Sequence, residues 1–395
     1  MISRDKGTSV FGQMAKDGEI MSAALDHQSL RSLAPGHEKV LRSFTAPEVA
    51  KLLGITPTYL RNLHHKNRIP LPEGETAGRR TYTAAEIYAI REELAVNAKD
   101  PLSYLPGRRE GDGLQVISTV IFKGGSSKTT LTCHAVQKLA LSGYRVLAVD
   151  LDPQASLSTI FGLRPEIELF SSGSVYDAIR YEDPVPMRDI IRKTYFHNID
   201  LAPASLMLSE FDTETPVALR KKIEPPFYLR LDQAIKQVEV DYDLVVIDCA
   251  PQMSYLTMAA MIASTGIVVP VVPNMIDVAS LAQFMRMSTE LLKVIHEAGH
   301  HFDYKFMRYL ITRFIPSDAP QAQMAVFLRV HFEDRVMTEP FLMSTAISDA
   351  GLTNNTLYEM NRSDFHRNTY DRAIESINKV VEELERDIWK AWGRS

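Results

Sequence analysis

Between residues 115 and 350, short apolar runs alternate with longer stretches of helical period. Runs such as "RVLAVD", "DLVVID", "GIVVPVV" and "YLITRF" are rich in β-branched residues and have few polar positions. Strands that are apolar on both faces are typical of a parallel sheet covered by helices on each side. The pattern therefore predicts a doubly wound α/β domain, with ligands bound at the carboxyl ends of the strands.

Residues 44 to 95 follow a different pattern, in which short helical stretches are separated by turn signals. Thr45, with Glu48 three residues later, forms a capping box, and the apolar stripe that follows ends at Gly54. A second helix start, Thr56-Pro57, opens another stripe of the same period. Two short helices joined at Gly54 predict a helix-turn-helix with 56–67 in the recognition position.

The flank of this helix pair strengthens the interpretation. A Gly-rich turn precedes the basic pair Arg79-Arg80, and Thr83 caps a further helix, which resembles the winged helix-turn-helix of the MerR type. Basic side chains suit phosphates and groove edges, and an asparagine can read a base. The candidate DNA-binding residues are Thr58, Arg61, Asn62, Lys66, Arg68, Arg79 and Arg80. A small helical protein–protein module is the alternative, because the shape alone does not prove DNA binding.

Charge and composition change this picture in three ways. Residues 1–110 carry a net charge of +3 and the remaining residues −8. This difference favours an N-terminal part that faces nucleic acid and an acidic C-terminal part. His64 and His65 lack a cysteine or acidic partner at ligand spacing, so we expect histidines on the phosphate-facing side or elsewhere on the surface, and no metal site. Two cysteines in 395 residues, with no signal peptide and no apolar run of membrane length, lead us to expect the reducing cytoplasm.

Four segments follow from these patterns. Residues 1–40 are expected to be a loosely ordered arm with one short helix near 22–33, and a pairing role for this arm stays open. The expected winged helix-turn-helix domain comprises 41–98. A linker of 99–114, rich in proline and glycine, then leads to an ATPase domain of 115–395.

The segment "FKGGSSKTT", residues 122–130, lies between a predicted strand and a predicted helix, which is the context of a phosphate-binding loop. The strict pattern G-x-x-x-x-G-K-[ST] fails at Phe122 and at Ser127. Lys128 is nevertheless placed to neutralise phosphate charge, and Thr129 to offer a hydroxyl to Mg²⁺. If the backbone of Ser127 needs a positive φ, serine costs about 1 kcal/mol more than glycine there.

"KGGSSKTT", with Lys123 five residues before Lys128, resembles the deviant Walker A motif K-G-G-x-x-K-[ST] of the ParA and MinD ATPases. The resemblance implies that Lys123 reaches the nucleotide of a partner subunit. It also implies a nucleotide-binding set of Gly124, Gly125, Ser126, Ser127, Lys128, Thr129 and Thr130. Ser127 departs from the family, where glycine normally precedes the second lysine, so we expect slow hydrolysis.

Two further segments resemble motifs of the same family. In "AVDLDPQASLSTIFG", the resemblance gives Asp152 the role of orienting the attacking water and places Asp150 on the metal side. In "DYDLVVIDCAP", Asp248 corresponds to the Walker B carboxylate, so the expected Mg²⁺ set is Thr129, Asp150 and Asp248. By the same resemblance, the expected base pocket contains Pro273, Thr312 and Arg313.

A winged helix-turn-helix in front of a deviant Walker ATPase is the layout of the large plasmid-partition ParA proteins, and this chain looks most like the RepA group of repABC replicons. The resemblance implies ATP, ADP and Mg²⁺ as ligands and a homodimer with ATP between its subunits. It further implies non-specific DNA binding in that state, repression of the protein's own operon, and a centromere-binding partner of the ParB or RepB type. Such proteins are cytoplasmic and associated with the nucleoid.

Three other classes remain to be weighed. An iron-sulfur ATPase of the nitrogenase iron-protein kind needs exposed cluster cysteines, whereas Cys133 and Cys249 are expected to be packed. A MinD-like membrane ATPase needs a basic amphipathic tail. The C-terminal helical stripe is better explained as docking on the core, because the polar, solvent-facing side of this helix carries acids that anionic lipid would repel, namely Glu382, Glu383, Glu385 and Asp387. A nucleotide-regulated repressor with little hydrolysis is favoured only by Ser127.

Overall fold

The computed structural model describes residues 10–32, 39–76, 79–169 and 173–394. The chain divides into two units, and the boundary between them in the sequence lies after Val40. The first contains one helix, α1 (Val10–Ser32), which is longer than the short helix predicted near 22–33. Its alanine, methionine, leucine and glutamine residues are strong helix formers, although the segment lacks a clear apolar stripe. Segments 1–9 and 33–38 of the predicted arm lie outside the described residues.

The second unit is built around an eight-stranded sheet of order β11-β10-β9-β4-β8-β5-β7-β6. Every neighbouring pair is parallel except β6 and β7, which are antiparallel at one edge. The predicted parallel sheet is therefore confirmed apart from this edge strand. The strands are β4 (Gln115–Thr119), β5 (Val146–Leu151), β6 (Arg192–Lys193), β7 (Ile199–Ala202), β8 (Leu244–Cys249), β9 (Gly266–Val271), β10 (Phe306–Phe314) and β11 (Phe341–Leu342).

Alternate residues of the central strands contribute to two separate hydrophobic cores. Val146 and Ala148 pack into one core together with helices α5, α15 and α16, whereas Leu147 and Val149 pack into the other with α8 and α10 to α14. This is the layered arrangement that strands apolar on both faces require. The helices are α5 (Lys128–Ser142), α6 (Ser156–Ile160), α7 (Pro165–Glu168), α8 (Val175–Ile179), α9 (Met187–Ile190), α10 (Leu208–Lys221), α11 (Phe227–Lys236), α12 (Tyr255–Ala263), α13 (Met275–Glu297), α14 (Ala319–Phe332), α15 (Thr345–Gly351) and α16 (Arg367–Ala391).

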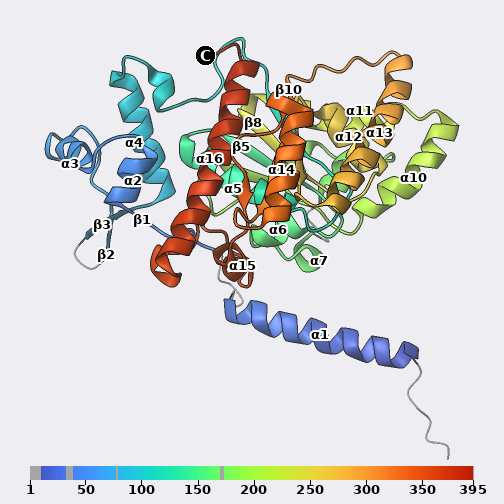
Figure 1. The fold of residues 1–395 in the computed structure, drawn as a ribbon, viewed down its shortest axis with the longest axis horizontal. Coiled ribbons are helices and arrows are strands. Elements are labelled where there is room, and N and C mark those ends of the chain that lie inside the picture. The colour runs from blue at the N-terminus through green and yellow to red at the C-terminus, as the bar shows by residue number, and fades with distance from the viewer. Residues whose placement is uncertain (1–9, 33–38, 77–78, 170–172, 395) are drawn as a thin grey trace, which may run out of the picture. The chain divides into compact units, whose positions relative to one another are not determined.

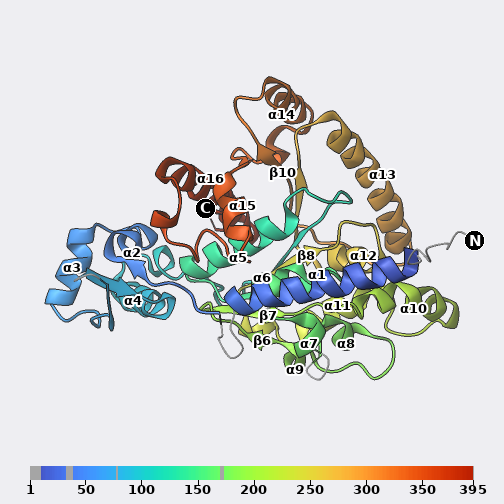
Figure 2. The same ribbon diagram turned by 90° about the horizontal axis from the view of Figure 1, so that it is seen from below.

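Residues 44–97 form a smaller set of elements beside α5 and α16 (Figure 1 and Figure 2). An antiparallel sheet of order β1-β3-β2 is accompanied by three helices. Threonines begin these helices as the sequence predicts, because Thr45 and Thr83 form capping boxes and the Thr56 hydroxyl accepts from the Tyr59 N–H. The elements are β1 (Phe44–Thr45), α2 (Ala46–Leu52), α3 (Pro57–His65), β2 (Gly74–Thr76), β3 (Arg79–Tyr82) and α4 (Ala84–Asn97).

The segment 99–114 contacts the sheet domain around Arg108, and several of its other residues are exposed. It contains a short 3-10 helix, η1 (Pro101–Ser103), and the Arg108 guanidinium donates to the carbonyls of Glu239 and Tyr242. Arg394, near the end of the chain, donates to the Pro106 carbonyl. Residues 41–395 accordingly form one compact unit, and the N-terminal helices α2, α3 and α4 share a hydrophobic core with α5 and α16.

The C-terminal helix α16 docks on the sheet domain through the predicted stripe, which includes Ile377, Val381 and Ile388. The prediction that Glu383 and Asp387 lie on a solvent-facing side is wrong. Both are buried and form ion pairs with Arg308 of β10, at 2.5 and 3.2 Å. A long-range cation therefore neutralises charges that helical period alone assigns to solvent. None of the described helices combines the length and hydrophobicity that crossing a bilayer requires.

Candidate nucleotide site and nucleic-acid interface

The loop after β4 runs over the centre of the sheet into the first turn of α5, so its N–H groups gather at a helix N-terminus. Gly125 and Ser127 both have left-handed backbones, with φ of 76° and 68°. Ser127 is the N-cap residue of α5. It therefore has the conformation in which a serine costs about 1 kcal/mol more than a glycine. The position has the geometry of a glycine and carries a side chain.

We expect Ser127→Gly to raise the turnover of ATP several-fold with little change in ATP affinity. The substitution removes backbone strain next to the N–H groups, and a transition state needs tighter placement of these groups than bound ATP does. The measurement is steady-state hydrolysis with and without DNA, together with equilibrium ATP binding, for both proteins. Equal or lower turnover in the glycine variant would exclude strain as the cause of slow hydrolysis.

The two lysines of the loop have different surroundings. Lys128 is buried, its ammonium donates to the Lys123 carbonyl at 3.2 Å, and burial lowers its pKa. The Lys123 ammonium instead pairs with Asp277 at 2.7 Å, with about a third of its side chain exposed. Asp277 lies in the first turn of α13, whose N-cap is Asn274. One lysine faces into the loop and the other is turned outward.

Asp277 was not predicted from the sequence. It lies 154 positions after Lys123, and the sequence offers only the Asn274 cap, which marks the start of a helix. Since a buried carboxylate costs free energy unless it is paired, the Lys123 ammonium stabilises Asp277 in this position.

Two buried carboxylates lie at the ends of neighbouring strands, because Asp150 of β5 is paired in register with Asp248 of β8. Burial, and then repulsion from Asp150, raises the pKa of Asp248 to about 8, while Thr129 and Lys128 lower it. Burial raises the pKa of Asp150 to about 7, while hydrogen bonds from Ser158 and Asp152 lower it. Two buried carboxylates this close repel each other when both are ionised, so a bound cation would stabilise the pair of Asp150 and Asp248.

The residues fit Mg²⁺, although unequally. Within the described residues, neither oxygen of Asp248 accepts a hydrogen bond of ordinary geometry, which leaves a buried carboxylate with free ligand atoms. Asp150 is less suited, because one oxygen accepts from the Ser158 N–H and hydroxyl at 2.8 and 2.7 Å, and the other from the Asp152 N–H. Thr129 and Asp248 are therefore the better ligand candidates, with Asp150 as a charge behind them.

Asp152 follows β5 and is half-buried at the same edge of the sheet. One of its oxygens accepts from the Gln154 N–H at 2.9 Å. Within the part of the chain that the structure describes, no hydrogen bond to the other oxygen is found, and a carboxylate oxygen can accept from water.

Of the expected base-pocket residues, Thr312 and Arg313 lie on β10 and Pro273 follows β9, and Arg313 contacts the loop. Arg313, at the end of β10, donates to the Gly125 carbonyl at 3.1 Å and has a left-handed backbone, with φ of 52°. Thr312 is fully buried, with an unpartnered hydroxyl among the described residues. Pro273 is buried directly before the α13 cap. Strain of this kind in a non-glycine residue is common at ligand sites.

The two cysteines, Cys133 and Cys249, are buried, as expected for packed residues. Burial raises the pKa of the Cys249 thiol. Neither presents an exposed thiolate of the kind that an iron-sulfur cluster takes.

On the smaller domain, all the candidate DNA-binding residues are exposed. Thr58, Arg61 and Asn62 share one face of α3, opposite the buried Leu60 and Leu63. The remaining candidates follow α3 or lie on β3, namely Lys66, Arg68, Arg79 and Arg80. Residues 77–78, between β2 and β3, lie outside the described residues.

The prediction of a surface position for His64 is wrong, whereas His65 is exposed as expected. His64 is buried, and its Nε2 lies 2.9 Å from the Tyr82 hydroxyl of β3. Burial, and then the nearby Arg80, lowers its pKa. The physical reason is that His64 follows Leu60 and Leu63 on the inner face of α3 and there finds a polar partner on the strand.

The fold and the loop define a P-loop ATPase of the partition class. Residues 114–298 match the family described as AAA domain. The chain is 46% identical over 388 residues to the "Putative replication protein A" of Rhizobium rhizogenes, covering 96% of this chain and 95% of that protein. It is 28% identical to Protein SopA of Escherichia coli K12, over 79% of each chain. Among solved structures, a "Partition Protein" matches with a TM-score of 0.66 at 15% identity, over 97% of this chain and 99% of that one.

The chain belongs to the ParA-type family of partition ATPases, within the group of the RepA proteins of repABC replicons. The resemblance stated from the two-lysine motif is thereby confirmed.

Proposed function

We propose that this protein is a plasmid-partition ATPase that pairs around ATP and Mg²⁺, binds DNA without sequence preference in that state, and represses its own operon. A centromere-binding protein of the ParB or RepB type stimulates its hydrolysis, and it works in the cytoplasm on the nucleoid. Residues 41–98 form a winged helix-turn-helix domain, 99–114 connect it, and 115–395 form the ATPase domain. The division of roles between Lys123 and Lys128 carries the proposal.

Within one subunit, the loop N–H groups, Lys128 and the hydroxyls of Thr129 and Thr130 hold the phosphates. Thr129 and Asp248 would hold Mg²⁺, which would supply positive charge to neutralise the phosphates. Asp152 orients the attacking water. Arg313, Thr312 and Pro273 border the base. Lys123 leaves Asp277 to reach the nucleotide of the second subunit, which is why its ammonium lies outside the loop.

DNA is bound in two ways under this proposal. The exposed face of α3 enters the major groove of an operator while Arg79 and Arg80 contact the backbone. Arg313, Arg329 and Arg335 are candidates for the non-specific contacts of the ATPase domain. Membrane targeting is disfavoured, because the apolar stripe of α16 is already buried in the core.

The test is DNA binding to two duplexes, one carrying the region upstream of the gene and one of random sequence, without nucleotide, with ADP and with ATP. We expect the upstream duplex to be preferred, at least about 10³-fold in affinity, in a nucleotide state other than the ATP dimer. Binding to random DNA should appear only with ATP and weaken steeply with salt. A protein with no preference in any state would contradict the proposed repressor role.

A further inference from the structure

The guanidinium of Arg91, on α4, lies where two helices end. Its Nε donates to the Leu141 carbonyl in the last turn of α5 at 3.0 Å, and a terminal nitrogen donates to the Leu52 carbonyl at the end of α2 at 2.7 Å. The other terminal nitrogen donates to the Tyr104 carbonyl at 3.1 Å. Three backbone carbonyls from three segments thus converge on one buried cation.

This arrangement is electrostatically specific. The last carbonyls of a helix have no partner within the helix and carry the negative end of its dipole, so two helix C-termini facing each other repel unless a cation lies between them. Burial lowers the pKa of Arg91 to about 10, so it keeps its charge at neutral pH. A planar guanidinium can serve several carbonyls at once, which an ammonium cannot do with the same geometry.

The residues around Arg91 at the end of α5 are also packed tightly. Gly143, just after α5, has a φ of 108°, and a Cβ there would meet the Tyr104 carbonyl oxygen at 3.1 Å and the Cδ of Arg91 at 3.2 Å. The end of α5 therefore lies in close contact with the side chain of Arg91, with little space for a side chain at position 143.

The opposite end of α2 is tied to the same helix by a second route. Arg42 donates to Glu48 in the first turn of α2 at 2.8 Å and to the Tyr358 carbonyl at 3.1 Å. The neighbouring Leu357 N–H donates to His134 of α5 at 3.3 Å. Both ends of α2 thus lead to α5, whose first residue is Lys128 of the phosphate-binding loop.

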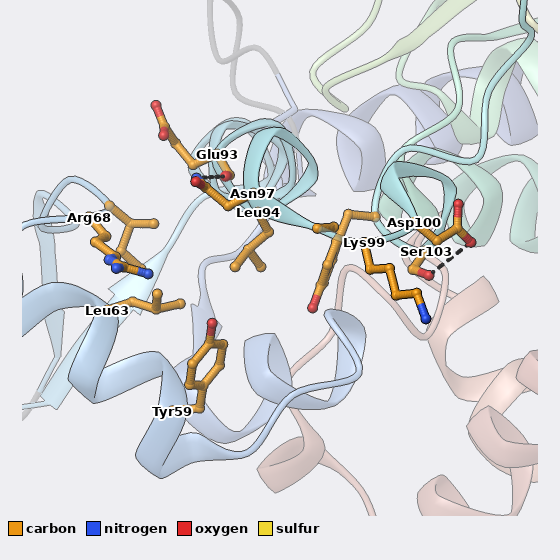
Figure 3. Close-up of a pocket in the computed structure, with 12 residues that line it drawn as sticks. Tyr59, Leu63, Arg68, Glu93, Leu94, Asn97, Lys99, Asp100 and Ser103 are labelled. Atoms are coloured by element: carbon orange, nitrogen blue, oxygen red, sulfur yellow. Dashed lines mark hydrogen bonds between the residues drawn. The ribbon is translucent and has the colours of Figure 1, made fainter.

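The recognition helix has room to respond. A pocket of about 330 Å³ separates α3 from α4 and η1, with Tyr59 and Leu63 on one side and Leu94 and Asp100 on the other (Figure 3). The pocket leaves unfilled space beside Tyr59 of α3, whereas Leu63 and Leu94, which also line it, belong to the shared core. Helix α5 has 15 residues and spans about 22 Å. A small tilt of this helix at the phosphate-binding loop would therefore displace its C-terminal end, where Arg91 binds.

We propose that Arg91 is the positioning residue through which nucleotide bound at the loop alters the α2–α3 pair, and with it the affinity for specific DNA. This inference rests on the proposed function. Because coupling between two sites is reciprocal, specific DNA must change the affinity for nucleotide by the same factor.

The experiment uses the full-length protein and Mg-ADP, which occupies the loop without requiring a second subunit. Binding of the upstream duplex is measured with and without ADP for the wild type, Arg91→Lys and the control Glu93→Gln, an exposed neighbour on α4. We expect ADP to change the wild-type and control DNA affinity by at least about fivefold. In Arg91→Lys we expect less than about a twofold change, with ADP affinity in the absence of DNA unchanged.

The inference would be overturned if ADP changed the DNA affinity of Arg91→Lys by the same factor as that of the wild type. It would also be overturned if the wild type bound ADP and the upstream duplex without either ligand affecting the affinity for the other. Those results leave the proposed function standing, whereas failure of the wild type to bind the upstream duplex in any state removes both. A second measurement uses the wild type alone, so it remains informative even if the Arg91→Lys variant misfolds. On adding ADP, hydrogen exchange should change at residues 53–56 after α2, and a change restricted to the loop contradicts the proposal.

Discussion

Replacing Lys128 with alanine should abolish ATP binding, whereas replacing Lys123 should leave ATP binding by the monomer largely intact and remove ATP-dependent dimerisation. Lys128 is buried, and its ammonium donates to the Lys123 carbonyl of the loop, where we propose that it neutralises phosphate charge. Truncating such a charge costs about 3 kcal/mol or more, roughly a hundred-fold in Kd. Equilibrium binding of a fluorescent ATP analogue and sedimentation with ATP measure the two properties separately.

The Lys123 variant needs a control that removes a lysine of similar exposure from another ion pair. Lys305 pairs with Asp303 at 2.7 Å, the same distance as between Lys123 and Asp277, so Lys305→Ala is a matched loss of one surface lysine. It should bind ATP and dimerise as the wild type does. If Lys123→Ala dimerised normally with ATP, the cross-subunit role would be wrong. If it lost ATP binding altogether, its role would lie within one subunit.

Features set by neighbours in the chain were predictable from the sequence. The threonine caps at Thr45, Thr56 and Thr83 and the stop at Gly54 depend on contacts over three or four residues, and each lies where it was expected. The left-handed backbone of Ser127 follows from the spacing of the loop motif. The carboxylates at the ends of β5 and β8 follow from parallel strands ending at one edge.

Features set by contacts distant in sequence were not predictable. A single arginine on a helix gives no sign that it will be buried between two helix ends, as Arg91 is. The charges of α16 looked exposed because helical period assigns one face to solvent, yet Arg308 comes from another element to pair with them. The base-pocket residues, by contrast, were named only through resemblance. Arg313 contacts the Gly125 carbonyl of the loop, and its role at the base stays a prediction.

The continuous core also changes how the two proposed DNA activities can be separated. Deleting residues 1–110 should remove operator binding and leave ATP-dependent binding to random DNA, since the latter belongs to the ATPase domain. However, the deletion also strips buried residues of α2 and α4 from the core shared with α5 and α16. Substitutions on the exposed face of α3 avoid this damage, because Arg61 and Asn62 project away from that core.

Asn62→Ala should therefore weaken binding to the upstream duplex by about 1–3 kcal/mol and relax sequence preference, since an amide reading a base edge contributes discrimination of that size. Arg61→Ala should weaken binding more uniformly and lower the slope of log affinity against log salt by about one. Neither should alter ATP-dependent binding to random DNA, and Lys236→Ala, which removes a surface cation on α11, should alter neither activity. Titrations of both duplexes at several salt concentrations decide the matter. Undiminished preference for the upstream duplex in both variants would mean that α3 is not the recognition helix, and the smaller domain would then be better explained as a protein–protein module.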